Sequence, residues 1–206
     1  MTRGPTEPAP FPPADLASRP LPLVRWESGA TVVRVHRAAH GPIHFSPGPD
    51  KPPLGRFDSA SGRFGVLYAA QAFEGAFVET LIRNPARALI SLAEIEARAL
   101  SIVAIHEEML LVDLTGPGLS RLGLDARFLS GPYDPCGAWA DALHDHPSQP
   151  AGIAYPSRFD PSQLCVALFS RLAPHLEPVT EPVPLNEMRS DVALILDRYG
   201  KALDPG

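Results

Sequence analysis

Glu79 lies in the apolar stretch GVLYAAQAFEGAFVETLI, residues 65–82, where a carboxylate is an unexpected side chain. A buried carboxylate costs free energy unless a partner or a ligand compensates its charge. If this stretch ends in a helix, a turn of about 100° per residue places Glu79 beside Gly75 and Ala72, which leave space around the carboxylate. The alternative is an exposed Glu79 that pairs with Arg83, four residues further on.

Two arginines precede this carboxylate in the sequence. Arg34 lies in the middle of ATVVRVHR, and Arg56 lies in GRFD at the end of a proline-rich segment. A guanidinium group presents a planar fork of donors that suits the oxygens of a diphosphate. Arg34 is thus either an anion ligand that faces a cleft or a surface arginine. Arg56 is either a ligand contact at a strand entrance or a turn residue that pairs with Asp58.

Two hydroxyl groups are further candidates. Tyr68 ends a predicted strand just before the segment of Glu79, so that its ring and the carboxylate can face one cavity; the alternative is a core tyrosine with a solvated hydroxyl. Ser157 lies in GIAYPSRFDP, at the end of another predicted strand. Because no GxSxG motif surrounds Ser157, we expect a hydrogen-bond donor to a ligand rather than a nucleophile.

A metal site is not expected from the histidines. His36, His40 and His44 repeat every four residues, which would suit metal ligands on a helix, but Gly41 and Pro42 interrupt any helix there. The chain also lacks the glycine-rich phosphate loops of the GxGxxG and P-loop kinds.

The elements that must position these residues follow from hydrophobic periodicity. Alternating apolar residues predict strands, and an apolar stripe with a period of 3.6 residues predicts helices. Strands and helices are mixed without regular alternation, which predicts a single domain of the α/β or α+β class with a central mixed sheet flanked by helices. The predicted strands are 30–37, 63–69, 100–105, 109–114, 152–155, 164–169 and 176–180, and the predicted helices are 71–83, 92–99, 133–146 and 189–200.

Length and composition bound the domain organisation. A chain of 206 residues is long enough for one well-filled core. With 25 prolines among 206 residues, its proline content is well above the usual share of about 5%, which predicts long ordered loops. Residues 1–29 are proline-rich and lack periodicity, so we expect an extended N-terminal segment that wraps the domain or a partner, with the domain itself at 30–206.

Charge and cysteine usage bound the cellular setting. A net charge of -5 provides no broad basic surface, which disfavours direct binding of nucleic acid. Cys136 and Cys165 are the only cysteines and form no CxxC motif, which is typical of a reduced, intracellular protein. No signal peptide or membrane span is expected, and the predicted location is the cytoplasm.

Taken in order, the motifs VVRVHR, GRFD, GVLYAAQAFEGAFVET, GIAYPSRF and LCVALF resemble the RES domain, the toxin component of RES/Xre toxin–antitoxin pairs. The likeness covers about residues 30–200 and implies a fold like that of ADP-ribosyltransferases. It also implies that NAD+ is consumed as substrate without a metal. The residues implied are catalytic Glu79 and Arg34, with Arg34, Arg56, Tyr68, Ser157 and His36 as NAD+ contacts.

The resemblance implies an enzyme that cleaves the nicotinamide–ribose bond and transfers ADP-ribose to water, phosphate or a protein. It further implies an inactive complex with an Xre-type helix-turn-helix antitoxin, which would carry any DNA contact. Two other hypotheses remain open from the residues. One is a non-catalytic module that binds a nucleotide or a partner, and the other is a metal-assisted hydrolase that uses the histidines.

Overall fold

A computed structural model describes residues 9–47 and 51–204. The helices of this part are α1 (Phe73–Leu81), α2 (Leu92–Glu96), α3 (Gly118–Arg121), α4 (Ala126–Ser130), α5 (Asp134–His144) and α6 (Arg189–Arg198), with the 3-10 helices η1 (Leu16–Ser18), η2 (Ser170–His175) and η3 (Leu185–Glu187). The strands are β1 (Leu23–Trp26), β2 (Thr31–Arg37), β3 (Val66–Ala70), β4 (Leu89–Ser91), β5 (Arg98–Ile105), β6 (Met109–Asp113), β7 (Gly152–Pro156), β8 (Leu164–Phe169), β9 (Leu176–Pro178), β10 (Val183–Pro184) and β11 (Ala202–Asp204).

Most of the strands form one mixed sheet. Within the described residues this sheet has nine strands in the order β1-β6-β7-β8-β3-β2-β5-β10, with β9 also paired to β5. β6 and β7 are parallel, whereas the neighbours on either side are antiparallel. A second, two-stranded sheet pairs β11 with β4 in parallel. A mixed sheet flanked by helices confirms the predicted fold class.

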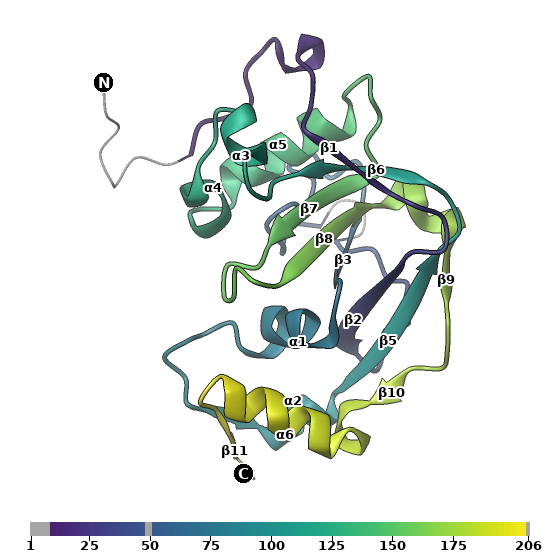
Figure 1. Cartoon of the computed structure of the whole chain (residues 1–206), viewed down its shortest axis with the longest axis vertical. Helices are drawn as coiled ribbons and strands as arrows, with labels where there is room; N and C mark the ends of the chain where they lie inside the picture. The colour runs from purple at the N-terminus through teal and green to yellow at the C-terminus, as the bar shows by residue number, and fades with distance from the viewer. Residues whose placement is uncertain (1–8, 48–50, 205–206) are drawn as a thin grey trace.

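The large sheet is divided near its middle. β2 pairs with β5 along its whole length, from Thr31↔Ala104 to Arg37↔Arg98, but pairs with β3 only through Val33↔Ala70. Figure 1 shows the two parts, with β1, β6, β7, β8 and β3 above and β2, β5, β9 and β10 below. Helix α1 lies at the junction between them and packs against both β2 and β3.

The core explains why α1 lies there. Phe73, Phe77 and Leu81 form the predicted apolar stripe, and the Phe77 ring is fully buried. A Cβ atom on Gly75 would lie 3.1 Å from Cβ of Ala70, so the glycine permits the close approach of α1 to β3. This face of the sheet is covered by the helices, while Val32, Leu67, Val103 and Leu168 fill a second apolar cluster on the other face.

The described part of the N-terminal segment packs against the domain. Leu16 is buried in the core, and β1 forms an edge strand beside β6. The Trp139 indole donates a hydrogen bond to the carbonyl oxygen of Pro10 at 2.9 Å. The predicted boundary after residue 29 therefore falls between two strands of one sheet, and residues 1–8 of the predicted extension lie outside the described residues.

Element ends differ from the predictions at several helices. α1 spans Phe73–Leu81 rather than the longer predicted range. α5 spans Asp134–His144, inside the predicted range 133–146, and its N-cap is Tyr133. α2 ends at Glu96, before the predicted end at residue 99, and the side chain of its N-cap Ser91 makes no capping hydrogen bond. Gly200 follows α6 with a φ of 60°, a left-handed conformation that favours glycine after the end of a helix.

Over residues 9–47 and 51–204, no helix combines the length and the apolarity needed to cross a membrane.

Candidate active site

A cavity of about 310 Å³ opens where β2 and β3 diverge. Beyond the single pair Val33↔Ala70, the next residues of the two strands no longer pair. Those residues line the cavity instead: Arg34 and Val35 from β2, and Tyr68 and Ala69 from β3. Helix α1, the end of β7 and the segment around α4 complete the wall. The division of the sheet therefore creates the site.

Glu79 lies on the wall of this cavity, on the side of α1 away from the stripe of Phe73, Phe77 and Leu81. Its Oε1 atom is buried and has no hydrogen-bond partner. Ala76 and Thr80 of α1 also line the cavity, as does Arg83 just after the helix. Gly75, predicted to leave space for the carboxylate, instead packs against β3, so the small residue beside Glu79 is Ala76. The alternative pairing with Arg83 is absent, because Arg83 donates to the Tyr133 hydroxyl at 3.3 Å.

Arg34 lines the same cavity from the middle of β2. Its Nη1 atom donates to the carbonyl oxygen of Pro42 at 2.7 Å. No carboxylate of the described residues pairs with this guanidinium. Burial without a compensating charge lowers the pKa of Arg34 to about 10. A partly buried cation that lacks an acidic partner favours the binding of an anionic ligand beside it.

Arg56 is held from several sides. Its Nη1 atom donates to the carbonyl oxygens of Phe128 and Gly131, both at 3.0 Å. The guanidinium also lies over the Tyr133 ring, 4.6 Å from its centroid. The second terminal nitrogen, Nη2, is buried and has no partner. Arg56 therefore does not pair with Asp58, and one of its terminal nitrogens is buried without a hydrogen-bond partner.

Tyr68 and Asp58 fix the segment that carries Arg56. The Tyr68 hydroxyl donates to Oδ1 of Asp58 at 2.9 Å and accepts from the Phe57 amide at 2.8 Å. Oδ2 of Asp58 accepts from the amides of Leu54 and Gly55 at 2.8 and 2.6 Å. Burial, with a smaller effect of the Asp58 charge, holds the pKa of Tyr68 well above its usual value. Tyr68 is thus a neutral wall residue with a satisfied hydroxyl.

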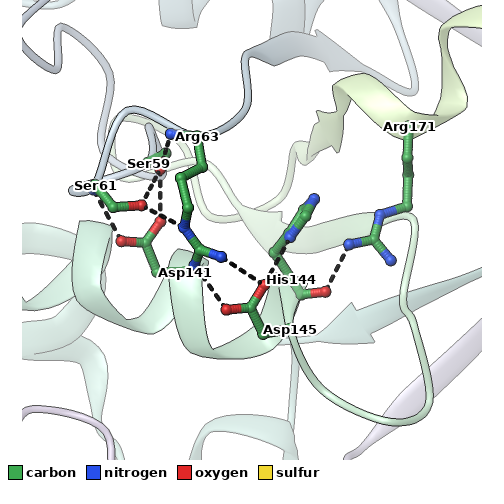
Figure 2. Close-up of polar contacts among 7 residues, drawn as sticks. All are labelled: Ser59, Ser61, Arg63, Asp141, His144, Asp145 and Arg171. Atoms are coloured by element: carbon green, nitrogen blue, oxygen red, sulfur yellow. Dashed lines mark hydrogen bonds and ion pairs between the residues drawn. The ribbon is translucent and has the colours of Figure 1, made fainter. Parts of the chain in front are cut away.

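Helix α5 holds the continuation of the same segment (Figure 2). Asp141 accepts hydrogen bonds from the Ser59 hydroxyl at 2.6 Å and from the Ser61 amide at 2.9 Å. Arg63 forms an ion pair with Asp145 at 2.6 Å. The hydrogen bond between Ser59 and Asp141 is partly buried, whereas the ion pair is exposed. Residues 54–63 are therefore tied to β3 on one side and to α5 on the other.

Two predicted site residues are not on the cavity wall. The Ser157 hydroxyl is buried and accepts hydrogen bonds from the amides of Phe159 and Asp160 at 3.1 and 3.3 Å. It shapes the turn that brings Arg158 and Phe159 to the cavity. His36 lies within 2.9 Å of the Ser101 hydroxyl. A direct ligand contact of Ser157 or His36 remains a prediction.

Several wall residues were not singled out from the sequence. Tyr133 precedes α5, Tyr155 lies in β7, and Arg98 begins β5. Burial, with lesser effects of the nearby Cys165 and Glu79, holds the pKa of Tyr155 well above its usual value. Arg98 and Tyr155 reach the cavity through the pairing of their strands, and Tyr133 reaches it from the start of α5. Apart from the position of Tyr155 beside Ser157, no local signal in the sequence marks them.

The cavity is strongly cationic. Its acidic wall residues are Asp58 and Glu79, and Asp58 is already engaged by internal donors. Five arginines line it: Arg34, Arg56, Arg83, Arg98 and Arg158. Such a site favours an anionic ligand whose cationic part lies against Glu79. Among the described residues, no group of three or more His, Cys, Asp or Glu side chains is arranged to hold a metal ion.

Comparisons with known proteins give consistent results. The profile of the RES domain family matches residues 31–195. The protein named "Probable toxin y4kH" of Sinorhizobium fredii is 33% identical over 111 residues, which cover 53% of this chain and 86% of that protein. The crystal structure of the M. tuberculosis MbcT-MbcA toxin-antitoxin complex holds a chain with a TM-score of 0.63 and 15% identity, covering 82% of this chain and 90% of that one. This likeness in structure shows a shared fold.

Proposed function

The chain belongs to the RES domain family, and from this premise we propose that it is the toxin of a toxin–antitoxin pair and consumes NAD+. One observation carries the proposal. Glu79 Oε1 and Arg56 Nη2 are buried polar atoms without partners, and both residues line one cavity. An unsatisfied buried polar group costs about 1–3 kcal/mol, which a ligand with complementary groups would offset.

NAD+ offers those complementary groups. Its diphosphate is an anion with oxygens that suit the guanidinium groups of Arg34 and Arg56. Its nicotinamide ring carries a positive charge that would lie favourably against Glu79. Tyr68 and Tyr155 present aromatic surface, and their raised pKa values keep both hydroxyls neutral. The cavity therefore provides an anion site, a cation site and aromatic walls.

The proposed reaction follows from these charges. When the nicotinamide–ribose bond breaks, nicotinamide leaves as a neutral molecule with the bonding electron pair, and positive charge develops on the ribose. The Glu79 carboxylate would stabilise that charge, which is largest in the transition state. An acceptor oxygen then bonds to the ribose carbon and releases its proton. Arg34 and Arg56 would hold the diphosphate so that the ribose stays beside the carboxylate.

The proposal includes a protein partner. The relative from S. fredii is named a probable toxin, and the similar M. tuberculosis chain comes from a toxin-antitoxin complex. We therefore expect a hetero-oligomer with an Xre-type antitoxin, in the cytoplasm, with DNA contacts made by the antitoxin. The net charge of -5 agrees with a chain that does not itself bind nucleic acid.

Release of nicotinamide from NAD+ tests this function. We expect the purified chain to release nicotinamide and Glu79→Gln to lose at least about 100-fold in rate, because the amide cannot offset the developing charge. Glu74→Gln is the matched control. Glu74 lies on the same helix but bonds to Arg198 at 2.6 Å and is not on the cavity wall. That variant should keep its activity.

The contrary outcomes separate the hypotheses. A Glu79→Gln protein that releases nicotinamide at the wild-type rate would exclude the proposed role of the carboxylate. A wild-type chain that releases no nicotinamide, yet binds NAD+ saturably in calorimetry, would be a binding module rather than an enzyme. Circular dichroism of each variant must show that the fold is retained.

A further inference from the structure

Arg98 and Arg37 form a cationic pair at the end of β2 and β5. The two residues lie directly opposite each other in the antiparallel register. Like charges in such a position repel and destabilise the strand pair. Burial, together with the charge of Arg37, lowers the pKa of Arg98. The charge of Glu94 acts in the opposite direction on the pKa of Arg98, but its effect is smaller than those of burial and Arg37, so the repulsion is only partly offset.

This pair adjoins the cavity described above. Arg98 is on the cavity wall, whereas Arg37 is exposed. By the alternation of a strand, Arg98 shares the sheet face of Leu100, which belongs to the helix-covered core. Along β5, Arg98 is three residues from Ser101, the register partner of Arg34, a separation of about 10 Å. The pair is therefore distinct from the guanidinium groups assigned to the diphosphate.

The charges of the cavity exceed what an unmodified dinucleotide needs. Five arginines face Glu79 and an Asp58 that is already bonded internally. A diphosphate diester carries two negative charges, which Arg34 and Arg56 suffice to neutralise. Arg83 and Arg158 have aromatic partners in Tyr133 and Phe159, and Arg98 has none. A ligand with a further anionic group would use this remaining donor.

We propose that Arg98, with Arg37 at the rim, forms a second anion subsite that binds a phosphate monoester on the dinucleotide. The inference rests on the proposed function and extends it to a substrate class: dinucleotides phosphorylated on the adenosine ribose, such as NADP+. A phosphate monoester carries a charge of about -1.5 to -2 and three acceptor oxygens. It matches two adjacent guanidinium groups better than a hydroxyl does.

The first test compares NADP+ with NAD+ in nicotinamide release. We expect the wild-type chain to use NADP+ at least as efficiently as NAD+. In Arg98→Gln, the ratio of kcat/KM for NADP+ to kcat/KM for NAD+ should fall about tenfold or more, because a charge-assisted hydrogen bond is lost. Arg25→Gln is the control. Arg25 is exposed, pairs with Glu108 at 2.8 Å and lies off the cavity wall, so the ratio should not change.

A second test does not depend on catalysis. Calorimetry on the wild-type chain compares adenosine 2′,5′-bisphosphate with ADP as probes. The bisphosphate should bind at least about tenfold more tightly, and Arg98→Gln should remove the difference. If neither dinucleotide is cleaved but the bisphosphate still binds more tightly than ADP, the proposed function fails and the subsite stands. The subsite would be overturned if Arg98→Gln lowered kcat/KM equally for both dinucleotides, or if the wild-type chain bound the bisphosphate no more tightly than ADP.

Discussion

At the scale of single residues, the site is marked by polar groups whose burial the protein itself does not compensate. Arg34 lies in a strand, yet its guanidinium bonds to one carbonyl and to no carboxylate. Glu79 and Arg56 each leave a buried atom without a partner. Such groups lower the stability of the folded chain and are retained where a ligand completes them. Stability and activity should therefore respond in opposite directions when these residues are replaced.

Arg34→Met tests that expectation. Methionine keeps an unbranched apolar side chain and removes the buried charge, so we expect the Tm to stay the same or to rise. Nicotinamide release should fall about tenfold or more, since the diphosphate loses a charged donor. Thermal unfolding and the release assay measure the two effects.

Arg25→Met is the control for Arg34→Met. Arg25 lies in β1, is exposed and pairs with Glu108 at 2.8 Å. Because exposed ion pairs contribute about 0–1 kcal/mol, this variant should change neither Tm nor activity appreciably. An Arg34→Met protein that is much less stable, or fully active, would show that the guanidinium is a structural group.

At the scale of elements, the segment 54–63 decides where Arg56 lies. Asp58 ties it to β3 through the Tyr68 hydroxyl, and Asp141 ties it to α5 (Figure 2). Gly55 lies against the Tyr68 ring. The segment has no regular structure but is fixed at both ends, so the donor in the cavity is held in place before a ligand arrives.

Gly55→Ala tests whether this contact matters. A Cβ atom at position 55 would lie 2.4 Å from the Tyr68 hydroxyl oxygen and 2.6 Å from two ring carbons, so the segment or the ring must move. We expect a loss of about 1–3 kcal/mol in the free energy of unfolding and weaker NAD+ consumption as Arg56 shifts. Urea unfolding and the release assay provide the measurements.

Gly41→Ala is the matched control. A Cβ atom there meets no heavy atom within 4 Å, so the stability should change by less than about 0.5 kcal/mol. Equal stabilities of the two variants would mean that segment 54–63 adjusts freely around Tyr68.

The same elements show what the sequence predicts and what it does not. Periodicity predicted β2, β8 and the buried stripe of α1, because these patterns depend on local alternation between core and solvent. The neighbours of Glu79 were predicted less well: the small residue beside it is Ala76, since Gly75 serves the contact with β3. Which small residue lies beside Glu79 depends on the orientation of α1 about its own axis relative to the sheet, and the helical pattern alone does not determine that orientation.

At the scale of the whole molecule, the cavity is a product of strand order. Arg34, Tyr68 and Glu79 come from neighbouring elements, but Tyr155 arrives through strand pairing and Tyr133 lies just before α5, where it contacts Arg56 and Arg83. No local pattern reveals that β3 lies between β8 and β2, or that β2 leaves β3 after one residue pair. For that reason Arg34, Arg56, Tyr68 and Glu79 were found as motif residues, and the arginine of the proposed second subsite was not.

The N-terminal segment is also part of this assembly rather than an addition to it. β1 covers the edge of β6, Leu16 is 3% exposed in the core, and Phe11 is 63% exposed. Leu16→Ala should therefore lower the free energy of unfolding by about 2–5 kcal/mol, as for other buried leucines. Phe11→Ala, in the same segment, should change it by less than about 0.5 kcal/mol. Urea unfolding distinguishes the two, and equal small effects would mean that the segment is detached from the domain in solution.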